Sequence, residues 1–137
     1  MFNAVIDTNV LFTGLTRLGP DAEVVDAWIQ AKFLPCVSTA LALEYHAILL
    51  SKLNPRKRPH LPGALQALLS RARFTPINFT YRPASPDPGD DFVIDCTLNA
   101  SACLVTNNLK DFRDSSAHLG FPLYTPLSFI QLLKQET

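Results

Sequence analysis

The stretch NAVIDTNVLF, residues 3–12, decides how the fold of this 137-residue chain begins. Residues 3–6 have the short apolar pattern of a buried strand, and Asp7 follows that strand directly. A charge between apolar neighbours is costly unless it is paired, so we interpret Asp7 as a functional carboxylate. The alternative is that Asp7 caps a turn or helix after the strand.

Strand-like and helical patterns alternate along the rest of the chain. Strands are predicted over 34–37, 74–79, 103–106 and 121–124, and helices over 21–33, 39–50, 65–69 and 90–100, with a closing helix that begins at 125–126. This alternation predicts an α/β fold in which helices cover both faces of a parallel sheet, in one domain spanning residues 1–137. In such sheets ligands bind at the carboxyl ends of the strands.

The composition excludes several classes of protein. Apolar residues make up 47% and charged residues 18%, which is not a disordered composition. The longest apolar runs are too short to span a bilayer and the N-terminus has no basic signal region, so we expect a cytoplasmic protein with no membrane partner. Cys36, Cys96 and Cys103 lack CxxC spacing and are expected to be buried thiols.

The net charge is zero, but the charges are unevenly distributed. Residues 45–86 contain no acid and seven Lys or Arg, while the other segments hold all twelve acids and five bases. A basic region beside acidic ones suits an enzyme that holds phosphates with one part and metals with another. The predicted contacts to a nucleic-acid phosphate backbone are Lys52, Arg56, Lys57 and Arg58. The alternative is a solvated basic face.

Acidic and amide side chains gather where the predicted strands end. Glu44 lies in the second turn of the helix after the second strand. Asp90 and Asp91 begin the helix after the third strand, and Asn108 follows the fourth strand with Asp111 one turn later. Hard divalent ions prefer such oxygen ligands and balance clustered carboxylates. An ion of this kind activates water for attack on a phosphodiester, so no nucleophilic side chain is needed.

The acids of the helix over 90–100 also have structural interpretations. Asp90, in PGDD before an apolar run, can be an ordinary helix N-cap, a role that is compatible with metal binding. Asp95 is predicted to face solvent. His46, His60 and His118 show no mutual spacing typical of metal ligands, so they are not predicted to bind metal.

Three stretches together resemble the PIN-domain family, over nearly the whole chain. VIDTNVLF is similar to the opening strand and first metal aspartate of the family, at Asp7, and STALALEYHAIL to the helix with its glutamate, at Glu44. DPGDDFVIDCTLNASACLVTNNLKDF is similar to the third and fourth motifs. Asp90, sixteen residues before Thr106, matches the third acid, and Asp91 is the neighbouring alternative. Within this family, the sequence of these stretches most resembles the VapC-like toxins of toxin–antitoxin pairs.

This resemblance implies a three-layer α/β/α sandwich with a parallel sheet in the order 3-2-1-4-5. It also implies Mg²⁺ or Mn²⁺ as cofactor, endoribonuclease activity, a homodimer and a small cognate antitoxin as partner. One position departs from the family pattern, because Asn108 stands where a fourth aspartate is frequent. An amide oxygen ligates weakly and brings no charge, and Asp111 is a candidate to compensate.

Two other functions compete with a ribonuclease. The first is a PIN-fold module that binds RNA or protein and cuts poorly, which the amide at position 108 favours. The second is phosphotransfer with Asp7 as the nucleophile. The second function is disfavoured because DTN lacks the second aspartate of a DxDxT motif.

Overall fold

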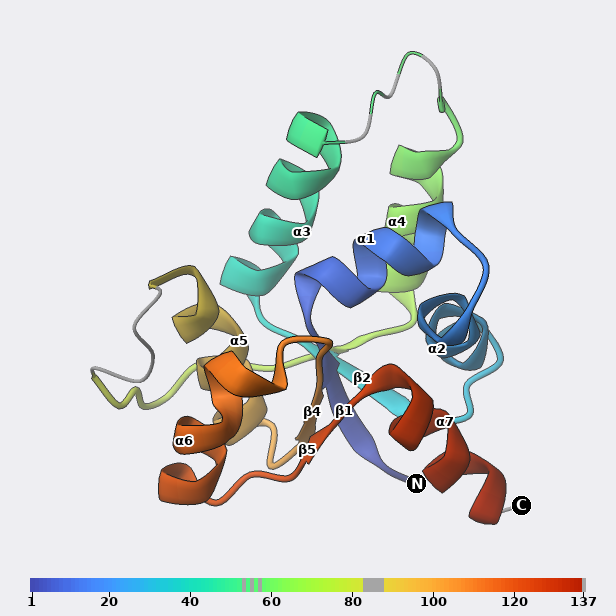
Figure 1. Cartoon of the computed structure of the whole chain (residues 1–137). Coiled ribbons are helices and arrows are strands. Elements are labelled where there is room, and N and C mark those ends of the chain that lie inside the picture. The colour runs from blue at the N-terminus through green and yellow to red at the C-terminus, as the bar shows by residue number, and fades with distance from the viewer. Residues whose placement is uncertain (53, 55, 57, 83–87, 137) are drawn as a thin grey trace.

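A computed structural model of the chain describes residues 1–52, 54, 56, 58–82 and 88–136. Its centre is a five-stranded sheet in the order β3-β2-β1-β4-β5, and every pair of neighbouring strands is parallel (Figure 1). The α/β class and the strand order are therefore as predicted. The strands are β1 (Asn3–Ile6), β2 (Leu34–Val37), β3 (Arg73–Phe74), β4 (Cys103–Val105) and β5 (Leu123–Tyr124).

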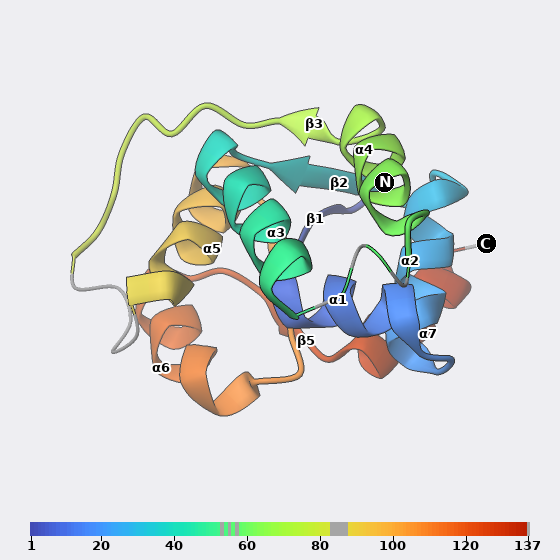
Figure 2. The ribbon, with the colours of Figure 1, turned by 90° about the horizontal axis from the view of Figure 1, so that it is seen from above.

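Helices in the described part of the chain cover the sheet on both sides. Figure 2 shows α5 and α6 on one side of the sheet and α2 and α7 on the other. In Figure 1, α1, α3 and α4 lie above the carboxyl ends of the strands. The helices are α1 (Thr8–Thr16), α2 (Pro20–Ile29), α3 (Thr39–Lys52), α4 (Leu61–Ser70), α5 (Pro88–Asn99), α6 (Leu109–Leu119) and α7 (Pro126–Gln135).

The central strands are buried almost throughout, because helices cover both faces of the sheet. β1 and β2 bury their last three residues and β4 buries all three of its residues, as continuous apolar runs in covered parallel strands do. One large apolar cluster joins the sheet to the surrounding helices. α7 begins as predicted, with Thr125 as its N-cap and Pro126 as its first residue, and Thr125 and Ser128 form a reciprocal capping box.

Several element boundaries differ from the predictions for local reasons. The predicted strand over 74–79 is wrong beyond Phe74, because Pro76 has no N–H for a sheet ladder. The predicted helix over 21–33 ends at Ile29, and Ala31 has a positive φ of 56° in the turn that follows.

Two helices, α1 and α6, have no counterpart among the predicted elements. α1 contains Gly14, where a Cβ would lie 2.5 Å from the carbonyl oxygen of Asp21, so close packing on α2 requires glycine there. α6 is mostly polar and buries only Phe112 and Ser115 among its residues. α1 therefore depends on packing more than on a strong local pattern, whereas α6 offers few apolar residues from which a sequence pattern could be recognised.

Two expectations from composition can be compared with the structure. No helix among the described residues is both long and apolar enough to cross a bilayer. Cys36, Cys96 and Cys103 are buried free thiols, as predicted. Burial raises the pKa of Cys96 and of Cys103 to about 12, so both thiols stay protonated near neutral pH.

Candidate active site

Asp7 and Thr106 meet where the two central strands end. β1 and β4 pair in register, with Ile6 opposite Val105, so the residues that follow them are neighbours. The backbone N–H of Asp7 donates to the carbonyl oxygen of Val105 at 2.9 Å. The Thr106 hydroxyl donates to Oδ2 of Asp7 at 2.7 Å, and Asp7 is only 6% exposed. The strand ends therefore fix this carboxylate in a buried position.

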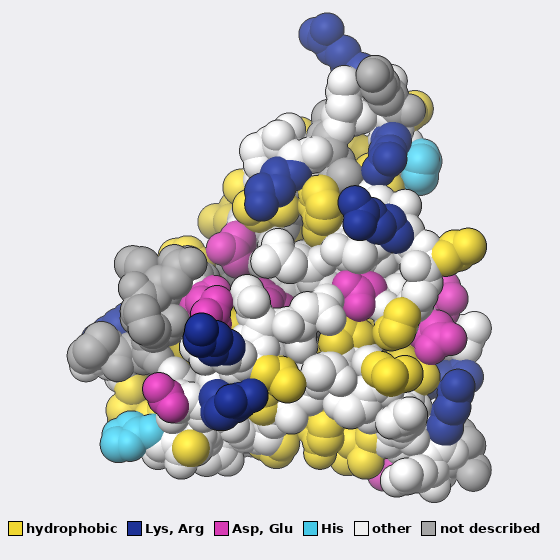
Figure 3. All heavy atoms as spheres, viewed as in Figure 1, with side chains coloured by type: hydrophobic (Ala, Val, Ile, Leu, Met, Phe, Trp, Pro, Cys, Tyr) yellow, Lys and Arg dark blue, Asp and Glu magenta, His cyan; other side chains and the backbone are white. Residues whose placement is uncertain are grey.

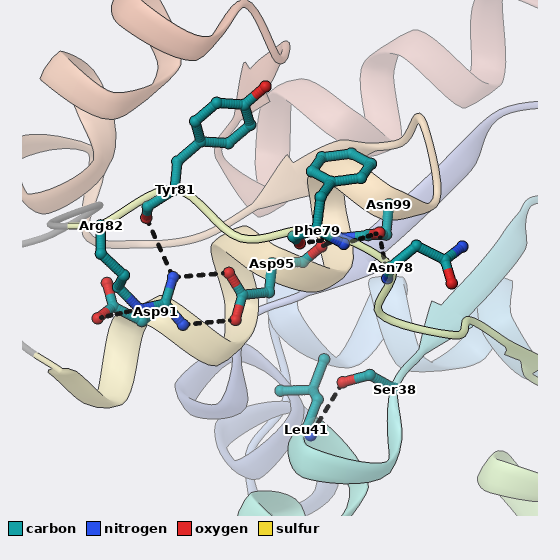
Figure 4. Close-up of polar contacts among 9 residues, drawn as sticks. All are labelled: Ser38, Leu41, Asn78, Phe79, Tyr81, Arg82, Asp91, Asp95 and Asn99. Atoms are coloured by element: carbon teal, nitrogen blue, oxygen red, sulfur yellow. Dashed lines mark hydrogen bonds and ion pairs between the residues drawn. The ribbon is translucent and has the colours of Figure 1, made fainter.

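Glu44 approaches the same place from α3. Ser38 precedes the first residue of this helix, and its Oγ accepts from the backbone N–H of Leu41 at 3.1 Å (Figure 4). The Tyr45 hydroxyl donates to the carbonyl oxygen of Ile6 at 2.6 Å and ties α3 to the end of β1. The hydroxyl of Thr8, the residue after Asp7, donates to Oε2 of Glu44 at 2.8 Å. The Glu44 carboxylate is thus hydrogen-bonded to the residue that directly follows Asp7 in the chain.

The charges around Asp7 are unfavourable to its ionised form. Burial raises the pKa of Asp7 above its ordinary value near 3.8. Hydrogen bonds from the Thr106 hydroxyl and the Thr8 backbone amide oppose this shift, while the carboxylates of Glu44 and Asp111 add to it. Two acidic neighbours therefore act on Asp7, and a cation beside it would relieve this repulsion.

The loop after β4 brings polar side chains to this edge of the sheet. The backbone N–H of Asn108 donates to Oγ1 of Thr106 at 2.9 Å, and Asn108 then caps α6 with its side chain exposed. Asp111 lies in the first turn of α6, also exposed. The side-chain amide of Asn107 donates to Oδ2 of Asp21, in the first turn of α2, at 2.9 Å.

Asp21 and Thr106 are two residues near this edge that the sequence analysis missed. Burial raises the pKa of Asp21, and the hydrogen bond from Asn107 opposes that shift. Thr106 had an available signal, because it follows β4 as Asp7 follows β1. Asp21 had none, since it follows a proline at an ordinary helix start.

The acids of α5 divide into different environments. Asp90 and Asp91 lie in the first turn, and both are half-buried. Asp91 pairs with Arg82, with Nε and Oδ2 3.5 Å apart. The prediction that Asp95 faces solvent is wrong, because Asp95 is 6% exposed and receives two hydrogen bonds from Arg82 at 2.8 and 2.7 Å (Figure 4). Its partner, Arg82, precedes α5 in the sequence and is separated from it by residues 83–87, so the periodicity of the helix alone did not reveal the pair.

The predicted basic contacts lie around the end of α3. Lys52 is exposed in the last turn of that helix, and Arg56 and Arg58 are exposed in the connection to α4. Lys57 lies outside the described residues. Figure 3 shows Lys and Arg side chains over this upper part of the molecule and Asp and Glu side chains across the middle of the same face. Asn54 shapes the connection, since its side-chain oxygen accepts from the N–H of Arg56 at 3.0 Å.

The donor chemistry of this edge suits a hard divalent ion. Among the described residues, no three His, Cys, Asp or Glu side chains converge closely enough to form a complete metal cage. Mg²⁺ is usually held by one or two carboxylates while water completes its shell, so a full protein cage is not required. Asp7, which is buried, and Glu44, which is half-buried, supply two carboxylates of this kind.

Comparisons with known proteins agree with this fold. A family model described as a PIN domain matches residues 3–110, and no curated protein sequence gives a significant match. Among solved structures, a chain in the crystal structure of VapBC2 from Rickettsia felis, bound to a DNA fragment from their promoter, aligns with a TM-score of 0.62. That alignment covers 90% of this chain and 98% of that chain at 14% identity, which shows likeness of fold.

The match to the family model covers most of the chain and includes Asp7, Glu44, Asp90 and Asn108. It also includes the strands whose ends bring Asp7 and Thr106 together. Sequence and architecture thus lead to one assignment: the chain belongs to the PIN-domain family, whose members are generally nucleases.

Proposed function

We propose that the chain is a divalent-metal-dependent endoribonuclease and the toxin of a toxin–antitoxin pair, with residues 1–137 acting as one nuclease domain. The observation that carries this proposal is the environment of Asp7. It is a buried carboxylate at the junction of the central strands, and the like charges of Glu44 and Asp111 raise its pKa further. Such a site is costly in the free protein and becomes favourable when a cation binds.

The proposed catalytic residues are Asp7, Glu44 and Asp90. Bound Mg²⁺ or Mn²⁺ would supply an activated water and neutralise charge on the phosphodiester. Thr106 orients the Asp7 carboxylate through its hydroxyl, and Thr8 orients Glu44 in the same way. These hydrogen bonds fix the direction of the two carboxylates that would hold the metal.

Three further side chains complete the proposed ligand set. Asn108 and Asp111 stand on the β4 side of the site, at the cap and in the first turn of α6. Asp91 is the alternative to Asp90 as the third acid. Asp91 pairs with Arg82 through Oδ2, while its Oδ1 is buried and has no hydrogen-bond partner among the described residues, so either Asp90 or Asp91 can serve as the third acid.

RNA is proposed to cross from the acidic edge to the basic end of α3, where Lys52, Arg56, Lys57 and Arg58 contact phosphates. Each phosphate contact releases counterions, so binding weakens as salt rises. Replacing Arg56, Lys57 and Arg58 by Gln should make the negative slope of log affinity against log salt shallower by about two. The change should be the same for RNAs of unrelated sequence. An unchanged slope would assign this segment to solvent or to a protein partner.

The partners are proposed by analogy. VapBC2 is described as a complex bound to a DNA fragment from its promoter, and its likeness in fold favours an antitoxin partner for this chain too. A homodimer and a cytoplasmic location complete the proposal. Co-expression with the product of a small neighbouring reading frame would test the antitoxin, because a cognate partner should suppress the growth arrest that a toxin causes.

A PIN-fold binding module that cuts poorly is the second candidate. It is favoured by two observations: Asn108 brings no charge to the site, and Arg82 engages Asp91. One experiment separates the two candidates, namely cleavage of single-stranded RNA with Mn²⁺ and with excess chelator. We expect cleavage only with metal. Binding without cleavage at saturating Mn²⁺ would favour the module, and cleavage in chelator would overturn metal dependence.

A further inference from the structure

An extended segment, residues 78–82, lies along the outer side of α5 and is called the strap here (Figure 4). Asn99, at the end of α5, fastens one end of it. Its side-chain oxygen accepts from the N–H groups of Asn78 and Phe79 at 2.8 and 3.3 Å. Its side-chain amide donates to the carbonyl oxygens of Phe79 and Asp95 at 2.9 and 2.8 Å. One side chain therefore satisfies the backbone of both the strap and the helix.

Arg82 fastens the other end of the strap. Its two terminal nitrogens donate to the two oxygens of Asp95 at 2.8 and 2.7 Å, the bidentate geometry in which arginine binds carboxylates most strongly. Its Nε lies 3.5 Å from Oδ2 of Asp91. One guanidinium thus bridges two acids that stand one turn apart on α5.

The spacing of the contacts places them on a single face of the helix. Asp91, Asp95 and Asn99 are separated by four residues each, so they form one line along α5. Val93, Ile94 and Thr97 are buried on the opposite face. Asp90 precedes Val93 and Ile94 by three and four residues, which sets it above that buried face.

The first turn of a helix has few internal restraints, because its N–H groups have no partners within the helix. Carboxylates four residues apart also repel each other and weaken the turn that carries them. Arg82 opposes both effects, since its single positive charge lies between Asp91 and Asp95 and joins the first turn of α5 to the second. Asp90 belongs to that same turn, so its direction depends on the bridge.

We propose that Arg82 is a positioning residue that fixes the first turn of α5 and, through it, Asp90. The bridge to Asp91 and Asp95 acts on backbone geometry, and Arg82 does not itself touch the reacting groups. The consequence for metal binding rests on the proposed function, whereas the consequence for the helix turn does not. Groups that hydrogen-bond directly to a metal ligand commonly change metal affinity by about 10–100-fold when they are removed, and a residue that acts through the helix backbone should give an effect at the lower end of that range.

The test compares Arg82→Gln with Arg82→Lys and with Arg71→Gln as control. Arg71 is an exposed arginine from the same acid-free stretch, and its guanidinium donates to the carbonyl oxygen of Ile29 at 3.3 Å. Two quantities are measured on the full chain: hydrogen exchange of the amides of residues 92–94, whose helical carbonyl partners lie in the first turn, and Mn²⁺ affinity by calorimetry.

In Arg82→Gln we expect exchange at residues 92–94 to become faster by on the order of tenfold. Mn²⁺ affinity should fall by about tenfold. Arg82→Lys should restore part of both losses, because a lysine reaches a single carboxylate as a point charge. Arg71→Gln should leave both unchanged. If Arg82→Gln does not fold, Asp91→Asn keeps the fork to Asp95 and gives the same exchange comparison.

Unchanged exchange at residues 92–94 in a folded Arg82→Gln protein would overturn the proposal. Faster exchange with unchanged Mn²⁺ affinity would also overturn it, because the strap would then stabilise the helix without positioning Asp90. A wild-type protein that neither binds Mn²⁺ nor cleaves RNA would instead overturn the proposed function. The exchange comparison would still decide whether Arg82 fixes the turn.

Discussion

Asp7 and Asp95 are equally buried, at 6% exposure each, but their charges are balanced in different ways. Asp95 receives a bidentate pair of hydrogen bonds from Arg82, a permanent countercharge within the chain. Asp7 receives hydrogen bonds from a hydroxyl and a backbone amide, and its acidic neighbours Glu44 and Asp111 raise its pKa. The Asp95 carboxylate has its countercharge within the chain, whereas the surroundings of Asp7 leave negative charge for an external cation to balance.

The largest expected effect comes from Asp7→Asn. This change keeps the shape of the side chain and removes the carboxylate at the centre of the proposed site. We expect Mn²⁺-dependent RNA cleavage to fall by at least about a hundredfold, because ligand charge and water activation are lost together. Cleavage assays over a range of Mn²⁺ concentrations measure this loss. Full activity in the folded variant would show that Asp7 is a structural acid like Asp95.

The same substitution at the other buried acid should act on stability. Asp95→Asn leaves Arg82 without its fork, and we expect the free energy of unfolding to fall by about 1–2 kcal/mol, a value below that of fully buried pairs because Arg82 is 43% exposed. Chemical denaturation measures it. Asp7→Asn is the matched control and should be neutral or stabilising in chelator. Equal losses in both variants would remove the distinction between the two acids.

The position of each acid in the sequence explains why one was predicted and the other was not. Asp7 follows a buried strand directly, and the rule that sites lie at the carboxyl ends of parallel strands needs only local information. Glu44 was also predicted from local information, because it is the acid of an otherwise mostly apolar helix. The environment of Asp95 depends on Arg82, which reaches it through a segment without periodicity.

The fold shows the same division between local and tertiary causes. β2 agrees with its predicted bounds because apolar runs between turns are local signals, and the strand order agrees with the family resemblance. α1 was missed because its sequence, TNVLFTGLT, holds glycine and β-branched residues with weak helix preference. That helix gains its stability from packing on α2, where Gly14 allows close approach. Weak local preference and strong packing together hide such an element from sequence analysis.

The pH dependence of stability should separate the two acids further. The folded pKa of Asp7 is raised, so its contribution to stability is fully present below its unfolded pKa, near 3.8, and is lost as pH rises through the folded value. In chelator, the unfolding free energy of wild type relative to Asp7→Asn should therefore fall as pH rises from that region. Saturating Mn²⁺ should reverse the trend, because binding stabilises the folded state. A difference that does not change with pH would mean that Asp7 is balanced within the chain.

The smallest expected effect concerns Asn108, whose backbone N–H is hydrogen-bonded to Thr106, the residue that donates to the Asp7 carboxylate. Its N–H donates to Oγ1 of Thr106, and the Thr106 hydroxyl donates to Asp7, so position 108 is two hydrogen bonds from the central carboxylate. Asn108→Asp adds a negative charge there and should tighten Mn²⁺ binding. The gain should be about threefold to tenfold, because the side chain is exposed and solvent screens its charge.

Calorimetric titration of wild type and Asn108→Asp measures this gain, and cleavage at limiting metal should rise with it. Equal affinity would mean that Asp111 or Asp91 already supplies the fourth charge, and that Asn108 only orients the loop after β4. Weaker binding would be the more serious result. It would place the side chain of residue 108 outside the metal site, although its backbone N–H is hydrogen-bonded to Thr106. The metal that balances the negative charge around Asp7 would then be held by acids of α3 and α5 and not by residue 108.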